Sequence, residues 1–149
     1  MIQANDMQVN GNHYVSKYQH WDLCVNTQLG YLEAQVTRYL TRWRKKDGLV
    51  DLKKALHYAN KLLEVAPRVA PFRGSLKFGV EWVRDEGHSF CAENHIEGLE
   101  RDLILVYVSW QQEHELITAR DMICELMDDF EASPVPLTEE NHHAERASQ

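Results

Sequence analysis

The feature that most limits the possible folds of this chain is a pair of amphipathic segments separated by the dipeptide Asp47-Gly48. Apolar residues recur every three or four positions in residues 29–46 and again in residues 50–65. The first stripe consists of Leu32, Val36, Tyr39, Leu40 and Trp43, and the second of Leu52, Ala55, Leu56, Ala59, Leu62 and Leu63. This period predicts two helices, each with one apolar face. Because a short turn joins them, we expect an antiparallel hairpin.

The C-terminal half shows a similar but less regular pattern. Lys77–Val83 alternates like a strand and also fits a helical turn, so residues 66–88 stay ambiguous. Apolar spacing predicts a third helix from Ser89 to about Gln112 and a fourth from about Glu115 to Glu131.

These patterns predict an all-α, bundle-like fold made of two helical hairpins with flexible tails at both ends. The expected division is a flexible N-terminus (1–11), a first hairpin domain (12–66), a second hairpin (67–131) and a disordered tail (132–149). A chain of 149 residues is long enough to bury a core without disulfides.

Three features of the sequence point to the cytoplasm. Cys24, Cys91 and Cys124 are an odd number, lie far apart and form no CxxC pair, so we expect reduced, mostly buried thiols. No apolar run reaches the roughly 20 residues that span a bilayer, and the N-terminus lacks the pattern of a signal peptide.

Charge is distributed unevenly along the chain. Residues 38–61 contain eight Lys/Arg and two Asp, a net charge of +6, so the remainder of a chain with net charge -7 carries -13. The acidic total argues against general nucleic-acid binding, since such binding needs a basic face. The local excess instead predicts one surface that attracts anions.

The first hairpin is where we expect a binding site. Gln35, Arg38 and Arg42 follow one stripe of the first helix, with Lys45 and Lys46 near the turn. The second helix adds Lys54, His57 and Tyr58, and Asp51 lies in its first turn. Arginine forks and lysine ammonium groups suit a di- or triphosphate, although such a strip can also be a simple solvated face.

Asn12-His13-Tyr14 and the segment from Gly30 to Tyr58 resemble the phage family called domain of unknown function 3310. That family combines an early His-Tyr, a helix with an Arg and Lys cluster, and then Asp-Leu-x-Lys-Ala-x-x-Tyr, which reads Asp51-Leu52-Lys53-Lys54-Ala55-Leu56-His57-Tyr58 here. The resemblance covers residues 12–64. The chain departs from it at Ala34-Gln35, where the family usually has Gly-Asn.

The resemblance implies a phage protein of nucleotide metabolism, working in the infected bacterial cell. One podovirus member of the family is described as a deoxynucleoside monophosphate kinase without the usual phosphate-binding loop, and GxxxxGK[ST] is absent here too. We therefore expect a (deoxy)nucleoside monophosphate kinase-like protein, with ATP as phosphate donor and Mg²⁺ as a candidate cofactor. The family positions at issue are His13, Tyr14, Arg38, Tyr39, Arg42, Lys45, Lys46, Asp51, Lys54 and Tyr58. His13, Asp51 and His57 are the candidate proton acceptors.

An acidic constellation supports an alternative function. Glu97-x-x-Glu100 and Glu125-x-x-Asp128 fall on the two C-terminal helices and would bind Mg²⁺ if they converged. They are similar to the paired carboxylates of MazG-type nucleotide pyrophosphohydrolases, but Ile96 replaces the first Glu of that pattern.

Two further hypotheses remain open. His88, Cys91 and His95 share a helical spacing that zinc ligands use, although a buried cysteine beside two surface histidines explains it as well. The second hypothesis is that the protein is not an enzyme. It would then be a host-takeover or anti-defence protein whose basic strip binds a host protein or sequesters a nucleotide. Apolar residues left exposed on the hairpins would favour a homo-oligomer.

Overall fold

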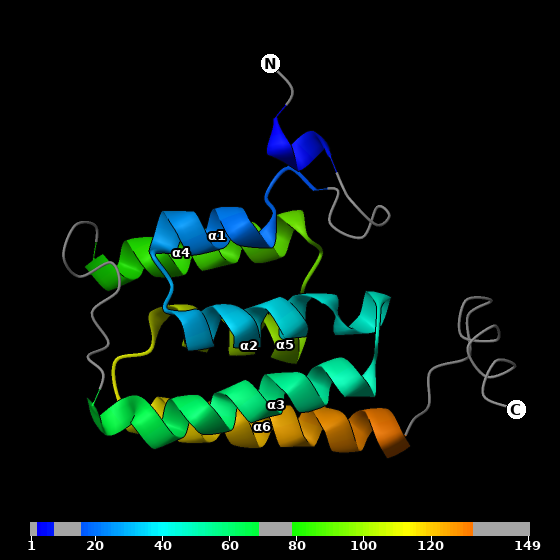
Figure 1. Cartoon of the computed structure of the whole chain (residues 1–149), viewed down its shortest axis with the longest axis vertical. Coiled ribbons are helices and arrows are strands. Elements are labelled where there is room, and N and C mark those ends of the chain that lie inside the picture. The colour runs from blue at the N-terminus through cyan, green and yellow to red at the C-terminus, as the bar shows by residue number, and fades with distance from the viewer. Residues whose placement is uncertain (1–2, 8–15, 69–78, 133–149) are drawn as a thin grey trace, which may run out of the picture.

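The computed structural model describes residues 3–7, 16–68 and 79–132, and these residues form helices and short connections without any strand. This confirms the predicted all-α fold. Six α-helices lie within the described residues (Figure 1). They are α1 (His20–Thr27), α2 (Tyr31–Arg42), α3 (Leu49–Val65), α4 (Gly79–Glu93), α5 (Gly98–Ser109) and α6 (Glu113–Ala132). Short 3₁₀ turns cover Ala4–Asp6, Trp43–Lys45 and Ala66–Arg68.

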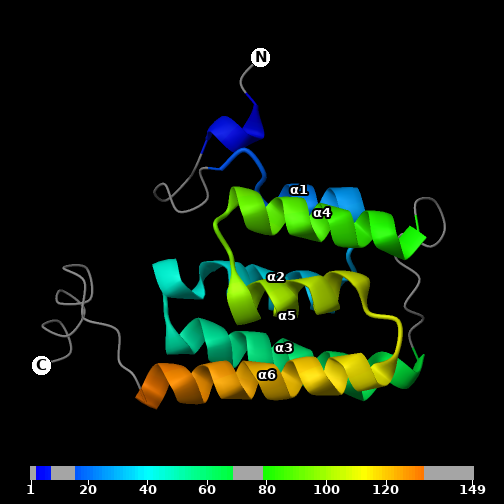
Figure 2. The same cartoon turned by 180° about the vertical axis from the view of Figure 1, so that it is seen from behind.

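The helices are stacked in three layers of two. Helix α1 lies beside α4, α2 beside α5, and α3 beside α6, so each half of the chain supplies one helix to every layer (Figures 1 and 2). Successive helices within each half also contact each other. The three helices of the first half therefore lie side by side in one row, and the three helices of the second half form the row behind it.

The first hairpin forms as its sequence predicts. Helix α2 ends at Arg42, the 3₁₀ turn Trp43–Lys45 follows, and Gly48 adopts a positive φ of 53° immediately before α3 begins at Leu49. The Gly48 amide donates to the carbonyl of Trp43 at 2.8 Å, which closes the turn. A residue without a Cβ accepts this backbone at low cost, so the Asp-Gly turn is explained.

The predicted third helix, Ser89 to Gln112, is wrong as one element. Helix α4 already begins at Gly79 and ends at Glu93, and a separate helix, α5, runs from Gly98 to Ser109. His95 has a positive φ of 55°, and the Ile96 amide donates to the carbonyl of Cys91 at 2.9 Å, which is a helix-ending turn. The ambiguous segment is helical from Gly79 onward, and Lys77 and Phe78 lie outside the described residues.

Asn94 connects the end of α4 to the segment before α1. Its side-chain amide donates to the carbonyl of Phe90 at 2.9 Å and to that of Tyr18 at 2.8 Å. The Tyr18 hydroxyl also donates a hydrogen bond to the Glu86 carboxylate on α4. The segment before α1 is thus fixed to the end of α4, a long-range contact that apolar spacing does not encode.

A single hydrophobic core is drawn from both halves of the chain. Its largest fully buried side chains include Leu40, Trp43 and Leu52 from the first half and Phe90, Leu103 and Ile123 from the second. Because the apolar faces of α2 and α3 cover those of α5 and α6, the two hairpins share their buried surface. None of the described helices has the length and apolar character to cross a bilayer.

Candidate functional site

The Tyr39 ring is the centre of the predicted site on α2 and α3. Three cationic groups lie near this ring: Arg42 Cζ is 4.8 Å from its centroid, Lys54 Nζ 5.5 Å and Arg38 Cζ 5.8 Å. Tyr58 stacks on Tyr39 with 5.9 Å between the centroids and an interplanar angle of 12°. The structure therefore brings together five of the predicted phosphate-binding residues around one ring.

The aromatic part of this site continues from Tyr58 to two neighbours. Tyr31 and His57 both approach the Tyr58 ring edge-on, with centroids 6.2 Å and 5.8 Å away. The hydrogen bond between the Tyr58 hydroxyl and Tyr31 raises the pKa of Tyr58 above its ordinary value. His57, one of the predicted proton acceptors, is exposed at the edge of this aromatic group.

Arg42 has a structural partner that the sequence did not indicate. Its guanidinium donates to Asp51 through Nε at 3.2 Å and through Nη2 at 3.0 Å, and only 7% of Arg42 and 0% of Asp51 are exposed. The Asp47 amide adds a bond to Asp51 at 3.4 Å. This buried pair ties α2 to the first turn of α3. Asp51 is thus in the predicted first turn, but its carboxylate faces the protein interior.

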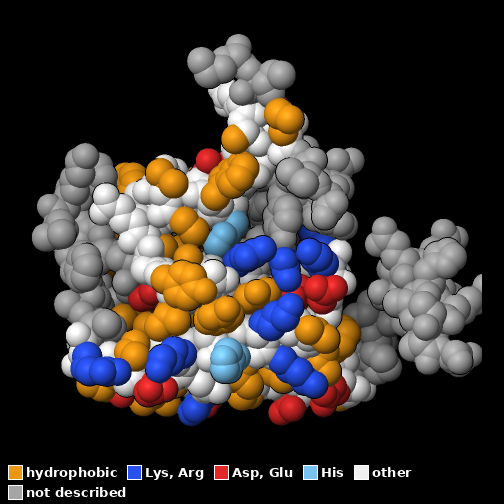
Figure 3. All heavy atoms as spheres, in the orientation of Figure 1, with side chains coloured by type: hydrophobic (Ala, Val, Ile, Leu, Met, Phe, Trp, Pro, Cys, Tyr) orange, Lys and Arg blue, Asp and Glu red, His pale blue; other side chains and the backbone are white. Residues whose placement is uncertain are grey.

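Arg38 and Lys54 are the cations of this site that face solvent. Within the described residues, neither side chain forms an ion pair or a hydrogen bond, and both are exposed. Figure 3 shows lysine and arginine side chains gathered over α2 and α3, among apolar side chains of the same face. Such cations keep their bonding capacity for an external anion.

The remaining predicted residues are placed less centrally. Gln35 is half-buried on α2, and Lys45 and Lys46 are exposed between α2 and α3. Lys45 lines a separate hollow with Arg44, His95 and Glu97. His13 and Tyr14 lie outside the described residues.

His20 is a neighbour of this site that the sequence analysis missed. It lies half-buried on α1, and its Nε2 is 2.8 Å from Oγ1 of Thr37. Burial, with the charge of Arg38 as a smaller cause, lowers the pKa of His20 to about 4. The imidazole is therefore neutral at pH 7. Its partner Thr37 on α2 is polar and does not belong to the apolar stripe of that helix. The contact between His20 and Thr37 is therefore visible only once α1 is packed on α2.

The cysteines match the prediction of free thiols. Cys91 is buried, Cys24 and Cys124 are half-buried, and all three are free. Burial raises the pKa of Cys24 to about 11 and that of Cys91 to about 12, so both thiols are protonated at pH 7. Cys24 Sγ lies 3.7 Å from Nδ1 of His20, a contact of a neutral thiol with a neutral ring.

The acidic residues of the alternative hypothesis do not converge. Glu97 precedes α5, and Glu100 binds Arg44 at 2.7 Å and Trp43 Nε1 at 3.2 Å. Glu125 and Asp128 are exposed on α6. Across the described part of the chain, which includes all four carboxylates, no three His, Cys, Asp or Glu side chains are placed to hold a metal ion.

The three residues of the zinc hypothesis differ in their exposure to solvent. Cys91 is 1% exposed in the core, whereas His88 and His95 are exposed. These three residues form no metal-binding group in the described ranges. The buried cysteine beside two surface histidines is the arrangement that the structure contains.

No family model matches this chain, and neither does any curated protein or solved structure.

Proposed function

We propose that the α2–α3 surface around Tyr39 binds a nucleotide through its phosphate groups. The observation that carries this proposal is the position of Arg38 on α2 and Lys54 on α3, whose charged groups lie 5.8 Å and 5.5 Å from the centre of the Tyr39 ring. Neither side chain has an acidic partner among the described residues. Other exposed cations, such as Lys53 and Arg84, also have no carboxylate partner among the described residues, but of these exposed cations only Arg38 and Lys54 lie against the Tyr39 ring.

The physical case rests on the geometry of the two cations. An arginine fork and a lysine ammonium group on neighbouring helices offer donors in different directions, as a phosphate group with several oxygens requires. The stacked Tyr39 and Tyr58 rings provide a surface on which the two cationic side chains lie. A surface whose donors are already ordered loses less entropy when it binds a ligand.

Phosphoryl transfer from ATP to a (deoxy)nucleoside monophosphate is the activity that we propose for this surface. Such a reaction depends on positioning and on neutralising phosphate charge, which the cations of α2 and α3 would supply. Asp51 is fully buried and hydrogen-bonded to Arg42, whereas His57 is exposed next to Tyr58. Among the described candidates, His57 is therefore the one we propose as proton acceptor.

A matched pair of double variants tests the binding site. We expect Arg38→Ala/Lys54→Ala to weaken binding of a deoxynucleoside monophosphate or ATP by about 100-fold, because two charge-assisted contacts are lost. Arg84→Ala/Lys53→Ala removes the same charges from exposed positions that do not contact Tyr39, and it should retain nearly full affinity. Isothermal titration calorimetry at constant salt measures both. Equal losses in the two variants would contradict a site at Tyr39.

Activity is measured separately by chromatography of each deoxynucleoside mono- and triphosphate, with and without ATP, Mg²⁺ and EDTA. Diphosphate formation that is lost in Arg38→Ala/Lys54→Ala supports the kinase. Pyrophosphate release that EDTA abolishes would favour the pyrophosphohydrolase instead. Nucleotide binding without turnover would keep the binding site, exclude the kinase and favour a sequestering protein.

A further inference from the structure

A hollow of about 540 Å³ lies at one end of the molecule, away from the Tyr39 ring. It is formed where the 3₁₀ turn after α2, the start of α5 and the last turns of α6 come together. Its apolar lining comes from Trp43, Leu99, Leu126 and Phe130. Trp43 and Phe130 pack edge to face, with centroids 5.4 Å apart, so this wall is fixed. The volume falls within the range of small-molecule sites.

The polar lining of the hollow contains three carboxylates and one cation: Glu97, Glu100, Asp129 and Arg44. Glu100 is already neutralised, because the Arg44 guanidinium donates to both of its oxygens at 2.7–3.1 Å. The Trp43 indole adds a further bond to Glu100 at 3.2 Å. Arg44 and Glu100 thus cancel each other and make one side of the hollow rigid.

Glu97 and Asp129 remain as the unneutralised charges of the hollow. Neither carboxylate has a hydrogen bond or an ion pair with any described residue. Asp129 also lies at the C-terminal end of α6, whose last turn contains no basic residue. The carbonyl groups at a helix C-terminus carry partial negative charge and favour a cation. The hollow therefore combines an apolar wall with a net negative rim.

We propose that this hollow binds an organic ammonium compound with a hydrocarbon body. The ammonium group pairs with Glu97 and Asp129, and the hydrocarbon part packs on Leu99, Leu126 and Phe130. A phosphate compound would meet two free carboxylates and an arginine that is already paired. The proposed nucleotide surface uses other residues, so this inference stands independently of it.

The test is a titration of the full-length protein with pentylamine, cadaverine and the neutral analogue pentanol. We expect saturable binding of the amines by isothermal titration calorimetry and at least tenfold weaker binding of pentanol. Glu97→Gln/Asp129→Asn should weaken amine binding about tenfold or more. Both substitutions should leave the fold intact, since Glu97 makes no side-chain cap bond and Asp129 is exposed near a helix C-terminus.

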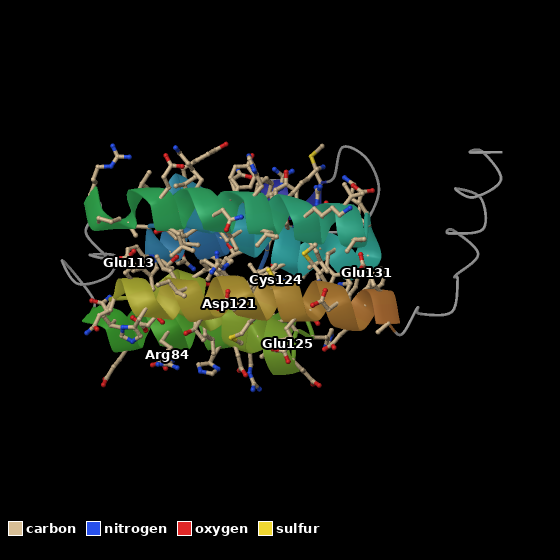
Figure 4. The ribbon with its side chains drawn as sticks, turned by 90° about the horizontal axis from the view of Figure 1, so that it is seen from below. Arg84, Glu113, Asp121, Cys124, Glu125 and Glu131 are labelled. Carbon is tan, nitrogen blue, oxygen red and sulfur yellow. The ribbon has the colours of Figure 1, made fainter. Side chains whose placement is uncertain are left out.

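The control is Glu125→Gln/Asp121→Asn, which removes the same two charges from the exposed side of α6 (Figure 4). These residues do not line the hollow, so the control should bind amines as the unmodified protein does. Equal weakening in both double variants would mean that amines respond only to net charge and would overturn the proposal. Absence of saturable amine binding, or pentanol binding as tightly as pentylamine, would overturn it as well.

Discussion

At the scale of single residues, the structure separates cations that have the same spacing in sequence. Arg38 and Arg42 lie one turn apart on the same polar stripe, but Arg38 is exposed and Arg42 is buried against Asp51. Spacing predicts which helix face a side chain occupies, and it does not reveal a partner nine residues away. The candidate site could thus be located from the sequence, while the separate roles of its residues could not.

The Arg42–Asp51 pair leads to a prediction about stability. Asp51→Asn should lower the free energy of unfolding by about 3 kcal/mol, because the buried guanidinium loses its carboxylate. Urea unfolding followed by circular dichroism measures this change. Asp128→Asn on the surface of α6, which has no ion pair among the described residues, is the control and should change stability by less than about 0.5 kcal/mol. A comparably small effect of Asp51→Asn would show that the buried pair contributes little.

At the scale of elements, two helices follow the apolar period closely, whereas the end of α2, the start of α4 and the break between α4 and α5 do not. Helices α3 and α6 begin and end within two residues of their predicted limits. The break between α4 and α5 escaped prediction because apolar residues keep a helical spacing on both of its sides. At this break Asn94 donates to the Tyr18 carbonyl, a contact between residues 76 positions apart that apolar spacing does not encode.

Substitutions at His95 test this break directly. His95 has a φ of 55°, so His95→Gly should be more stable than His95→Ala by about 1 kcal/mol. If residue 95 lay inside a continuous helix, the His95→Ala variant would instead be the more stable one, by about the same amount, because alanine has the higher helix propensity. Thermal or urea unfolding of the two variants decides between the turn and the unbroken helix from Ser89 to Gln112. Comparing Gly with Ala removes the effect of losing the imidazole.

At the scale of the whole molecule, the two halves depend on each other. Every layer pairs one helix from each half, and the buried side chains form a single core. The division into a hairpin domain at 12–66 and a second hairpin at 67–131 was drawn from chain order alone. It marks the two rows of helices, and it says nothing about whether either row is stable by itself.

A fragment of residues 1–68 tests this dependence. Without α5 and α6, the apolar faces of α2 and α3 lose most of the surface that covers Trp43, Leu52 and Leu62. We expect this fragment to show weak helical circular dichroism and no cooperative thermal transition, whereas the full chain unfolds in one transition. A sharp transition of the fragment would show that the first hairpin is an autonomous domain.

The sequence by itself determined the helical class, the α2–α3 hairpin with its Asp-Gly turn, and the concentration of positive charge on that hairpin. These properties are local, because apolar period, turn chemistry and charge are written in neighbouring residues. Only the tertiary structure decided that Arg42 is buried, that His20 meets Thr37, and that the chain turns at His95. Each of these depends on contacts between helices, which the local pattern of a single chain does not record.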